Sequence, residues 1–415
     1  MTSRQQEITN KYLDYRTNLQ QEDPDNIYLD ILITNVGSYT TSPPAITFNE
    51  ARQSPFLRHP EKYEMSIIRF QADTSTLPVF IPVIQPNQSD PNLTIYSITM
   101  SFQLNSSTPY YEQQTFIEFV PQNTQIPAPV PPSQTSNGLQ TPSQYYFYYN
   151  YQSFIYIIYN AFQKCFNDLN TQTGNYLVTN GAIPPTINWD VDTGKAVLYF
   201  QTQYYNTTGS NPSVPLQYNV IKVFFNTPLY YLFNSFVFLN RGDLAINGKN
   251  YQIVIGSFGT VNTITLPITS PTGTVCDVLF QEYSTSPLMT PITSICFTSS
   301  LLPIISTQLT APLLFNNGSI VQNTPSTNGT NANFINQITD ITLQGDQYIP
   351  NILYNPTAQY RFISLSGSSP LNQIDVQVYW KDRLGTFYPV YLQSGGSCTL
   401  KIYFRKKRYL IQDSK

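Results

Sequence analysis

The sequence is poor in charged residues and has almost no histidine. Asp, Glu, Lys and Arg make up 11% of its 415 residues, well below the roughly 25% of ordinary soluble domains. The one histidine, His59, lies in the apparent loop "RHPEK". Catalysis by a Ser-His-Asp or Cys-His arrangement would depend on this residue alone. A solvated loop histidine is the favoured interpretation, and we expect no enzyme activity.

Paired cysteines and long apolar runs are also missing. Cys165, Cys276, Cys296 and Cys398 stand far apart without a CxxC spacing, so we expect reduced, buried thiols and neither a metal site nor a cofactor. No apolar run reaches the ~20 residues that span a bilayer. The polar start "MTSRQQEITNKYLDY" is not a signal peptide, so we expect synthesis in the cytoplasm. A net charge of −3 gives no reason to expect general nucleic-acid binding.

Tyrosine, phenylalanine and proline are abundant instead, with 32, 25 and 32 copies. Aromatic residues favour strands, whereas long exposed helices need Glu, Lys and Arg. A surface rich in Tyr and poor in charge also favours contacts between protein copies.

Alternating apolar and polar residues predict eight strands in two groups. The strands are expected at 27–34, 63–71, 92–103, 289–299, 337–344, 359–366, 374–381 and 397–405. In the strand at 374–381, Val376, Val378 and Trp380 share one face, which we expect to point inward. Eight strands suffice for two four-stranded sheets, so the predicted fold class is all-β, a single jelly-roll β-sandwich.

The middle of the chain has a different character. A Pro- and Ser-rich stretch at 123–144 precedes the one convincing helix, at 153–169, for which Ser153 is a candidate N-cap. Further strands are expected beyond it, including one at 231–239. We therefore predict a mixed, mostly β inserted domain with one helix. The expected division is an N-terminal arm at 1–25, a first jelly-roll segment at 26–104, the inserted domain at 105–286, a second jelly-roll segment at 287–408 and a C-terminal tail at 409–415.

Three segments, in order, resemble one protein family. They are "ITFNEARQSPFLRHPEKYEMSIIRFQADTSTLPVFIP" (46–82), "PLMTPITSICFTSSLLPI" (287–304) and "VYWKDRLGTFYPVYLQSGGSCTLKIYFRKK" (378–407). Together they resemble the penton (vertex, minor capsid) proteins of virophages, adintoviruses and polinton-like viruses. The resemblance implies a structural virion protein that closes the fivefold vertices of an icosahedral capsid as a homopentamer. It also implies a double jelly-roll major capsid protein as the surrounding partner, and an inserted domain that projects outward and is available for attachment to a host receptor or glycan.

The tripeptide Arg241, Gly242 and Asp243 is the first candidate site. An exposed RGD loop can bind a receptor. Gly and Asp are equally expected in an ordinary turn between two strands.

The basic run Arg405, Lys406, Lys407 and Arg408 is the second candidate site. It could contact the genome or a neighbouring coat subunit. A solvated tail would have the same composition.

A β-sandwich carbohydrate-binding protein or glycoside hydrolase is the alternative function. A hydrolase needs two opposed carboxylates, and Glu118 and Glu282 are candidates, but no motif pairs them. The many tyrosines of the inserted domain could stack on sugar rings, which would serve attachment and not catalysis.

Overall fold

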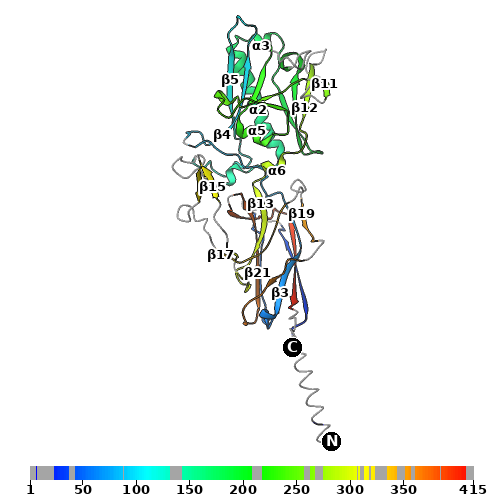
Figure 1. Ribbon diagram of the computed structural model, residues 1–415. Helices are drawn as coiled ribbons and strands as arrows, with labels where there is room; N and C mark the ends of the chain where they lie inside the picture. The colour runs from blue at the N-terminus through cyan, green and yellow to red at the C-terminus, as the bar shows by residue number, and fades with distance from the viewer. Residues whose placement is uncertain are drawn as a thin grey trace, which may run out of the picture. The chain divides into compact units, whose positions relative to one another are not determined.

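The computed structural model separates the chain into two compact units (Figure 1). Unit 1 comprises Met1–Leu77 and Ile292–Lys415, and unit 2 comprises Pro78–Pro291. The structure describes residues 6, 23–36, 43–86, 88–130, 143–207, 217–256, 262–266, 274–305, 307–308, 313–316, 319–322, 334–343, 351–356, 360–383 and 385–407.

Unit 1 is built from two antiparallel sheets. The first has the order β1 (Asn26–Thr34), β23 (Ser397–Lys406), β3 (Tyr63–Asp73) and β19 (Asn351–Tyr354), with β20 (Ile363–Ser364) also paired to β3. The second has the order β18 (Gln337–Ile341), β13 (Ile292–Thr298), β21 (Gln373–Asp382) and β2 (Thr47–Ala51), with β22 (Phe387–Pro389) also paired to β21.

The strand order of unit 1 is that of a jelly roll. Numbered one to eight along the chain, the main strands run 1-8-3-6 in one sheet and 5-4-7-2 in the other. The first and last strands are therefore neighbours, and each sheet mixes early and late segments, as two Greek keys require. The predicted fold class is confirmed. Unit 2 occupies the connection between the third strand, β3, and the fourth, β13.

The core of unit 1 follows the alternation seen in the sequence. On β23, Leu400, Ile402 and Phe404 are buried between more exposed neighbours. On β21, Trp380 is buried as predicted, and its ring stacks on that of Tyr388 with centroids 4.3 Å apart. The turn after β21 uses Gly385 at φ +81°, a left-handed conformation that suits glycine.

One buried carboxylate interrupts that alternation. Asp375 lies on the opposite face of β21 from Trp380, yet it is also buried. It accepts hydrogen bonds from the Ser300 backbone N–H (3.0 Å) and hydroxyl (2.7 Å), from the Leu301 N–H (2.9 Å) and from the Ser299 hydroxyl. The segment after β13 thus compensates the desolvation of Asp375 and fastens β13 to β21.

Unit 2 has two sheets and one long helix. One sheet has the order β5 (Tyr111–Glu118), β4 (Leu93–Phe102), β8 (Lys222–Phe225), β10 (Tyr251–Ile253) and β9 (Phe238–Asn240). The other has the order β11 (Asn262–Leu266), β12 (Thr274–Phe280), β7 (Lys195–Gln201) and β6 (Thr186–Asp190). The helix α2 (Tyr151–Gln172) contacts β4, β5 and β6, and so it packs against both sheets.

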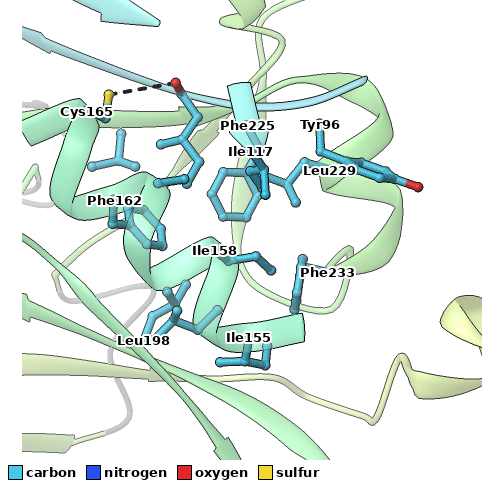
Figure 2. Close-up of a cluster of buried hydrophobic side chains, with 14 of the residues drawn as sticks. Tyr96, Ile117, Ile155, Ile158, Phe162, Cys165, Leu198, Phe225, Leu229 and Phe233 are labelled. Atoms are coloured by element: carbon cyan, nitrogen blue, oxygen red, sulfur yellow. Dashed lines mark hydrogen bonds between the residues drawn. The ribbon is translucent and has the colours of Figure 1, made fainter. Parts of the chain in front are cut away.

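The helix α2 carries the apolar face that organises the core of unit 2. Figure 2 shows Ile155, Ile158 and Phe162 of this helix among side chains from the strands and from the segment around α5 (Thr227–Leu232). The predicted helix at 153–169 lies within α2. Its N-cap is Asn150, whose side-chain oxygen accepts from the Ser153 N–H at 2.8 Å, so the assignment of Ser153 as the cap was wrong.

Several shorter elements were not predicted. They are α3 (Tyr176–Thr179), α4 (Thr202–Tyr205), α5, α6 (Ser286–Met289), η1 (Pro60–Lys62), η2 (Gln144–Tyr146), η3 (Ile246–Gly248), and the paired strands β14 (Thr307–Gln308) with β17 (Phe334–Ile335) and β15 (Leu313–Asn316) with β16 (Ser319–Gln322). The expected strand at 231–239 was wrong except at its end, where Phe238 begins β9. Asn226 caps α5 through the Leu229 N–H (3.2 Å), and Pro228 suits its first turn, so the chain is helical there until Leu232.

The strand expected at 92–103 belongs to a different sheet from the one predicted. It is β4, and it pairs with β5 and β8 in unit 2, whereas the short strand β2 and the strand β19 complete the two jelly-roll sheets. Both faces of β4 are buried: Ile98 and Met100 join the core around α2, while Ser97 and Thr99 lie under η3. The alternation of apolar and polar residues in β4 therefore distinguishes an apolar buried face from a polar buried face, and not a buried face from an exposed one.

Candidate interaction surfaces

The residues that could support hydrolysis lie on separate elements. His59 is exposed, with its Nδ1 3.5 Å from the Glu61 carboxylate. Glu118 ends β5 and pairs with the Lys164 ammonium at 2.8 Å, whereas Glu282 follows β12 in the other sheet of unit 2. In the structure Glu118 therefore forms a surface ion pair with Lys164 of α2.

The four cysteines are all buried. Burial raises the pKa of Cys165 and that of Cys398 to about 12, so both stay in the unreactive thiol form at neutral pH. Within the described ranges, no group of three His, Cys, Asp or Glu side chains is arranged to hold a metal ion. Among the helices described, none is both long and apolar enough to cross a bilayer.

The RGD tripeptide forms an exposed turn between β9 and β10. The Arg241 guanidinium donates to the side-chain oxygen of Gln252, with Nε at 3.1 Å. The Asn250 amide donates to the carbonyls of Gly242 and Asp243, both at 3.0 Å. A partner that bound Arg241 would have to replace its contact with Gln252, whereas Asp243 lies exposed.

Two apolar side chains follow the RGD turn, and the sequence patterns did not reveal them. Leu244 is 97% exposed, and Ile246 is also largely exposed. The segment is fastened at Gly248, where φ is +67° and an added Cβ would lie 2.7 Å from the Gln114 amide nitrogen and 2.8 Å from the Ser97 hydroxyl. The sequence signal was an isolated leucine and isoleucine between turn residues, which single-residue patterns do not distinguish from ordinary surface residues.

The basic run lies at the end of β23, and its described members contact their own chain. Arg405 pairs with Glu64, Lys406 lies 3.7 Å from the Asp25 carboxylate, and Lys407 donates to the carbonyl of Glu61 at 2.8 Å. Arg408 lies outside the described residues.

The outer face of the sheet β1–β23–β3–β19 carries a second set of exposed apolar residues. Leu32, Thr399, Gln71 and Leu353 are cross-strand neighbours in one row, so this row has an exposed leucine on each edge strand. We call the residues Tyr28, Asp30, Leu32, Arg69, Gln71, Leu353, Thr399, Lys401 and Tyr403 the outer face. Tyr28 and Leu32 occupy the solvent-facing positions of the alternation, which was the sequence signal for this surface.

The charged residues of the outer face pair with one another and leave a net charge of +1, from Arg69, Lys401 and Asp30. Asp30 pairs with Arg69 at 2.8 Å and lies 3.9 Å from the Lys401 ammonium. Beside this triad the rings of Tyr28 and Tyr403 stack, with centroids 4.7 Å apart and planes within 8°. The face therefore offers leucine and tyrosine side chains around an internally paired ionic cluster with one excess positive charge. Buried interface cores have a similar composition.

Known proteins are similar to this chain in both sequence and structure. The uncharacterized protein V18 of Sputnik virophage is 34% identical over 156 residues, which is 37% of this chain and 89% of that protein. The structural protein V19 of the same virophage is 27% identical over 229 residues, 54% of this chain and 97% of that protein. A chain of the Sputnik virophage cryo-EM structure matches with a TM-score of 0.75 and 27% identity over 93% of this chain and 100% of its own length. The crystal structure of the mavirus penton protein matches in fold, with a TM-score of 0.58 and 15% identity over 92% of this chain and 100% of its own.

Fold and relatives together define a minor capsid protein, a structural component of the virion and not an enzyme. The family model described as Sputnik minor capsid protein V18/19 matches residues 27–406. The chain belongs to that family. The resemblance to virophage vertex proteins drawn from the three sequence segments is thereby confirmed.

Proposed function

We propose that the protein is a penton subunit, five copies of which close a fivefold vertex of an icosahedral capsid. Membership of the V18/19 family and the shared fold of the mavirus penton protein support this proposal. So does the jelly-roll order of unit 1, a fold that recurs in viral capsids. The protein would be made in the cytoplasm of the host cell and assembled there into the particle.

The outer face is the observation that carries the proposal at the level of residues. Large exposed apolar side chains on a sheet cost solubility unless a partner covers them. Asp30 pairs with Arg69 and lies near Lys401, so only one positive charge on this face is left for a partner to balance. We propose that a neighbouring copy covers it in the ring. Closed rings of identical subunits bury such a patch once in each copy.

Light scattering on the purified full-length protein tests this assignment. The wild type is expected at five times the mass of one chain, and Leu32→Glu is expected to shift the population to monomer, because it puts a charge into the buried row. Val191→Glu is the matched control: Val191 lies in unit 2 and is 69% exposed, as is Leu32. A wild-type protein that stays monomeric and is absent from the vertices of imaged particles would contradict the penton proposal.

The surrounding partner is proposed to be the major capsid protein, of the double jelly-roll type. Arg405, Lys406, Lys407 and Arg408 are proposed to contact this coat protein or the genome. Because the described basic side chains pair with acidic or carbonyl groups of their own chain, a coat contact is favoured over the phosphate backbone. If these residues contact the genome, nuclease treatment of opened particles should release the protein. If they contact the coat protein, the protein should stay bound after the same treatment.

Unit 2 is proposed to project outward from the vertex and to supply host attachment. Its position in a single connection of the jelly roll supports this, because insertions at strand connections leave the parent sheets intact. Labelling intact virions with a membrane-impermeant amine reagent tests the projection. Lys164, more than half exposed on unit 2, is expected to be labelled, and Lys401 on the outer face to be protected. Equal labelling of both lysines would argue against it.

A further inference from the structure

A surface depression in unit 2 lies between the first turns of α2 and the segment that follows β5. It is lined by Val120, Pro121, Gln122, Tyr148, Asn150, Gln152, Ser153, Tyr156 and Ile157 and encloses about 440 Å³. That volume falls within the roughly 300–1,000 Å³ of small-molecule sites. None of these nine lining residues carries a charge.

The wall of the depression is held rigid by its own hydrogen bonds. The Gln122 amide nitrogen donates to the Ser153 hydroxyl at 2.6 Å, and its oxygen accepts from the Tyr149 N–H at 2.8 Å. The Tyr148 hydroxyl donates to the Val120 carbonyl at 3.2 Å. These contacts join α2 to the segment after β5, so the site requires little reorganisation to receive a ligand.

Other groups in the depression remain available to a ligand. Among the hydrogen bonds of the described residues, none uses the Gln152 side chain or the Asn150 amide nitrogen. Tyr156 is 58% exposed, on a helix whose other face fills the core of unit 2, so its ring is accessible from solvent. Its orientation is supported by the ring of Tyr159, with centroids 6.3 Å apart and planes within 25°.

We propose that this depression binds a neutral saccharide, an inference that rests on the attachment role proposed for unit 2. An aromatic face suits the C–H face of a sugar ring, and amide groups that both donate and accept suit the hydroxyls around it. A phosphate, sulfate or carboxylate would find no counter-charge among the lining residues. An entirely apolar ligand would strip water from the Gln152 and Asn150 amides without replacing their hydrogen bonds.

Saturation-transfer NMR with the full-length protein tests this inference. The probes are the methyl glycosides and disaccharides of glucose, galactose, mannose and N-acetylglucosamine, with sialyllactose as the anionic comparison. At least one neutral probe is expected to receive saturation, most strongly on the C–H protons of one ring face. Tyr156→Ala is expected to weaken its binding by about tenfold or more through loss of the stacking surface, and Gln152→Ala to weaken it by less.

Tyr283→Ala is the matched control, because Tyr283 is also in unit 2 and is 55% exposed. It should bind the same probe as the wild type does. The inference is overturned if no neutral probe receives saturation, if sialyllactose alone binds, or if Tyr156→Ala binds like the wild type. The light-scattering mass separates the two proposals: a ring that binds no sugar overturns only this inference, and a monomer that binds sugar overturns only the penton assignment.

Discussion

Unit 1 and unit 2 use similar strands to build two different cores. In unit 1 two sheets face each other, and strands such as β23 bury one side and leave the other partly exposed. In unit 2 the helix α2 packs against both sheets, and the central strand β4 is buried on both faces. A regular alternation therefore identifies which side chains share a face of a strand, and it leaves open which sheet the strand joins.

The largest expected effect comes from removing one large core side chain in each unit. Trp380→Ala in unit 1 and Phe162→Ala in unit 2 should each lower the free energy of unfolding by about 3–5 kcal/mol, because both side chains are almost fully buried. Hydrogen exchange read by mass spectrometry should show faster exchange in β13 and β21 for Trp380→Ala and in α2 for Phe162→Ala. Tyr379→Ala, at a half-buried position, should cost less. Faster exchange throughout both units for either variant would show that they unfold as one.

A second prediction concerns the close approach that buries the outer side of β4. Gly248→Ala should destabilise unit 2 by the cost of a left-handed alanine, about 1–2 kcal/mol, plus about 1–3 kcal/mol for the contact with Ser97 and Gln114. Gly174→Ala is the control, since its φ of +65° is nearly the same and an added Cβ meets nothing within 4 Å. If denaturant unfolding shows the same loss of stability for both variants, the turn at Gly248 accommodates the added Cβ without an energetic cost.

A third prediction tests Asp375, a buried carboxylate of unit 1. Burial alone would raise the pKa of Asp375, but the hydrogen bonds from Ser299, Ser300 and Leu301 lower it below its usual value. A lowered pKa in the folded state means that the ionised group stabilises the fold above about pH 4, and that this contribution is lost as the pH falls through the folded value.

Asp375→Asn should therefore cost about 1–3 kcal/mol at pH 7. The difference in the free energy of unfolding between wild type and variant should stay constant down to about pH 5 and become smaller below about pH 4. Thermal unfolding across this range measures it. Asp30→Asn on the exposed outer face is the control and should cost less than about 1 kcal/mol. A stability difference that grows as the pH falls would contradict the conclusion that Asp375 stabilises the fold as an ionised carboxylate.

The smallest expected effect is at a surface ion pair of unit 2. Glu118→Gln should change stability by no more than about 0.5 kcal/mol, and the change should vanish in high salt, because Glu118 and Lys164 are both exposed. Chemical denaturation at low and high salt measures it. A loss of stability of several kcal/mol that persists in high salt would show that the pair of Glu118 and Lys164 contributes more than an exposed ion pair does.

The jelly roll could be predicted because its strands show their period in the sequence, but two of its eight strands could not be placed. Five-residue β2 and four-residue β19 are too short for alternation to stand out from loop sequence. Conversely, β4 alternates over residues 97–102 but was assigned to the wrong sheet, because Ser97 and Thr99 resemble solvent-facing residues until η3 covers them.

The interaction surfaces were harder to infer than the fold. The RGD turn and the basic run are easily recognised in the sequence. In the structure, however, Arg241 contacts Gln252 and Arg405 pairs with Glu64. No local sequence pattern predicts these partners. The outer face and the depression beside α2 each combine residues from separate segments. Leu32 and Leu353, on the two edge strands, come to lie in one row only through strand pairing, which a single sequence does not specify.

The pairing of β1 with β23 has a consequence for how the chain is made. Asn26 lies opposite Arg405, so the first jelly-roll strand has no partner until β23 (Ser397–Lys406) has left the ribosome. Unit 2 has no such delay, since all its strands lie between Pro78 and Pro291. Domains completed early in synthesis fold first, and pairings of long sequence separation form slowly. During translation β1 therefore stays without its β23 partner while unit 2 can already fold, and the sheet that carries the outer face is completed last.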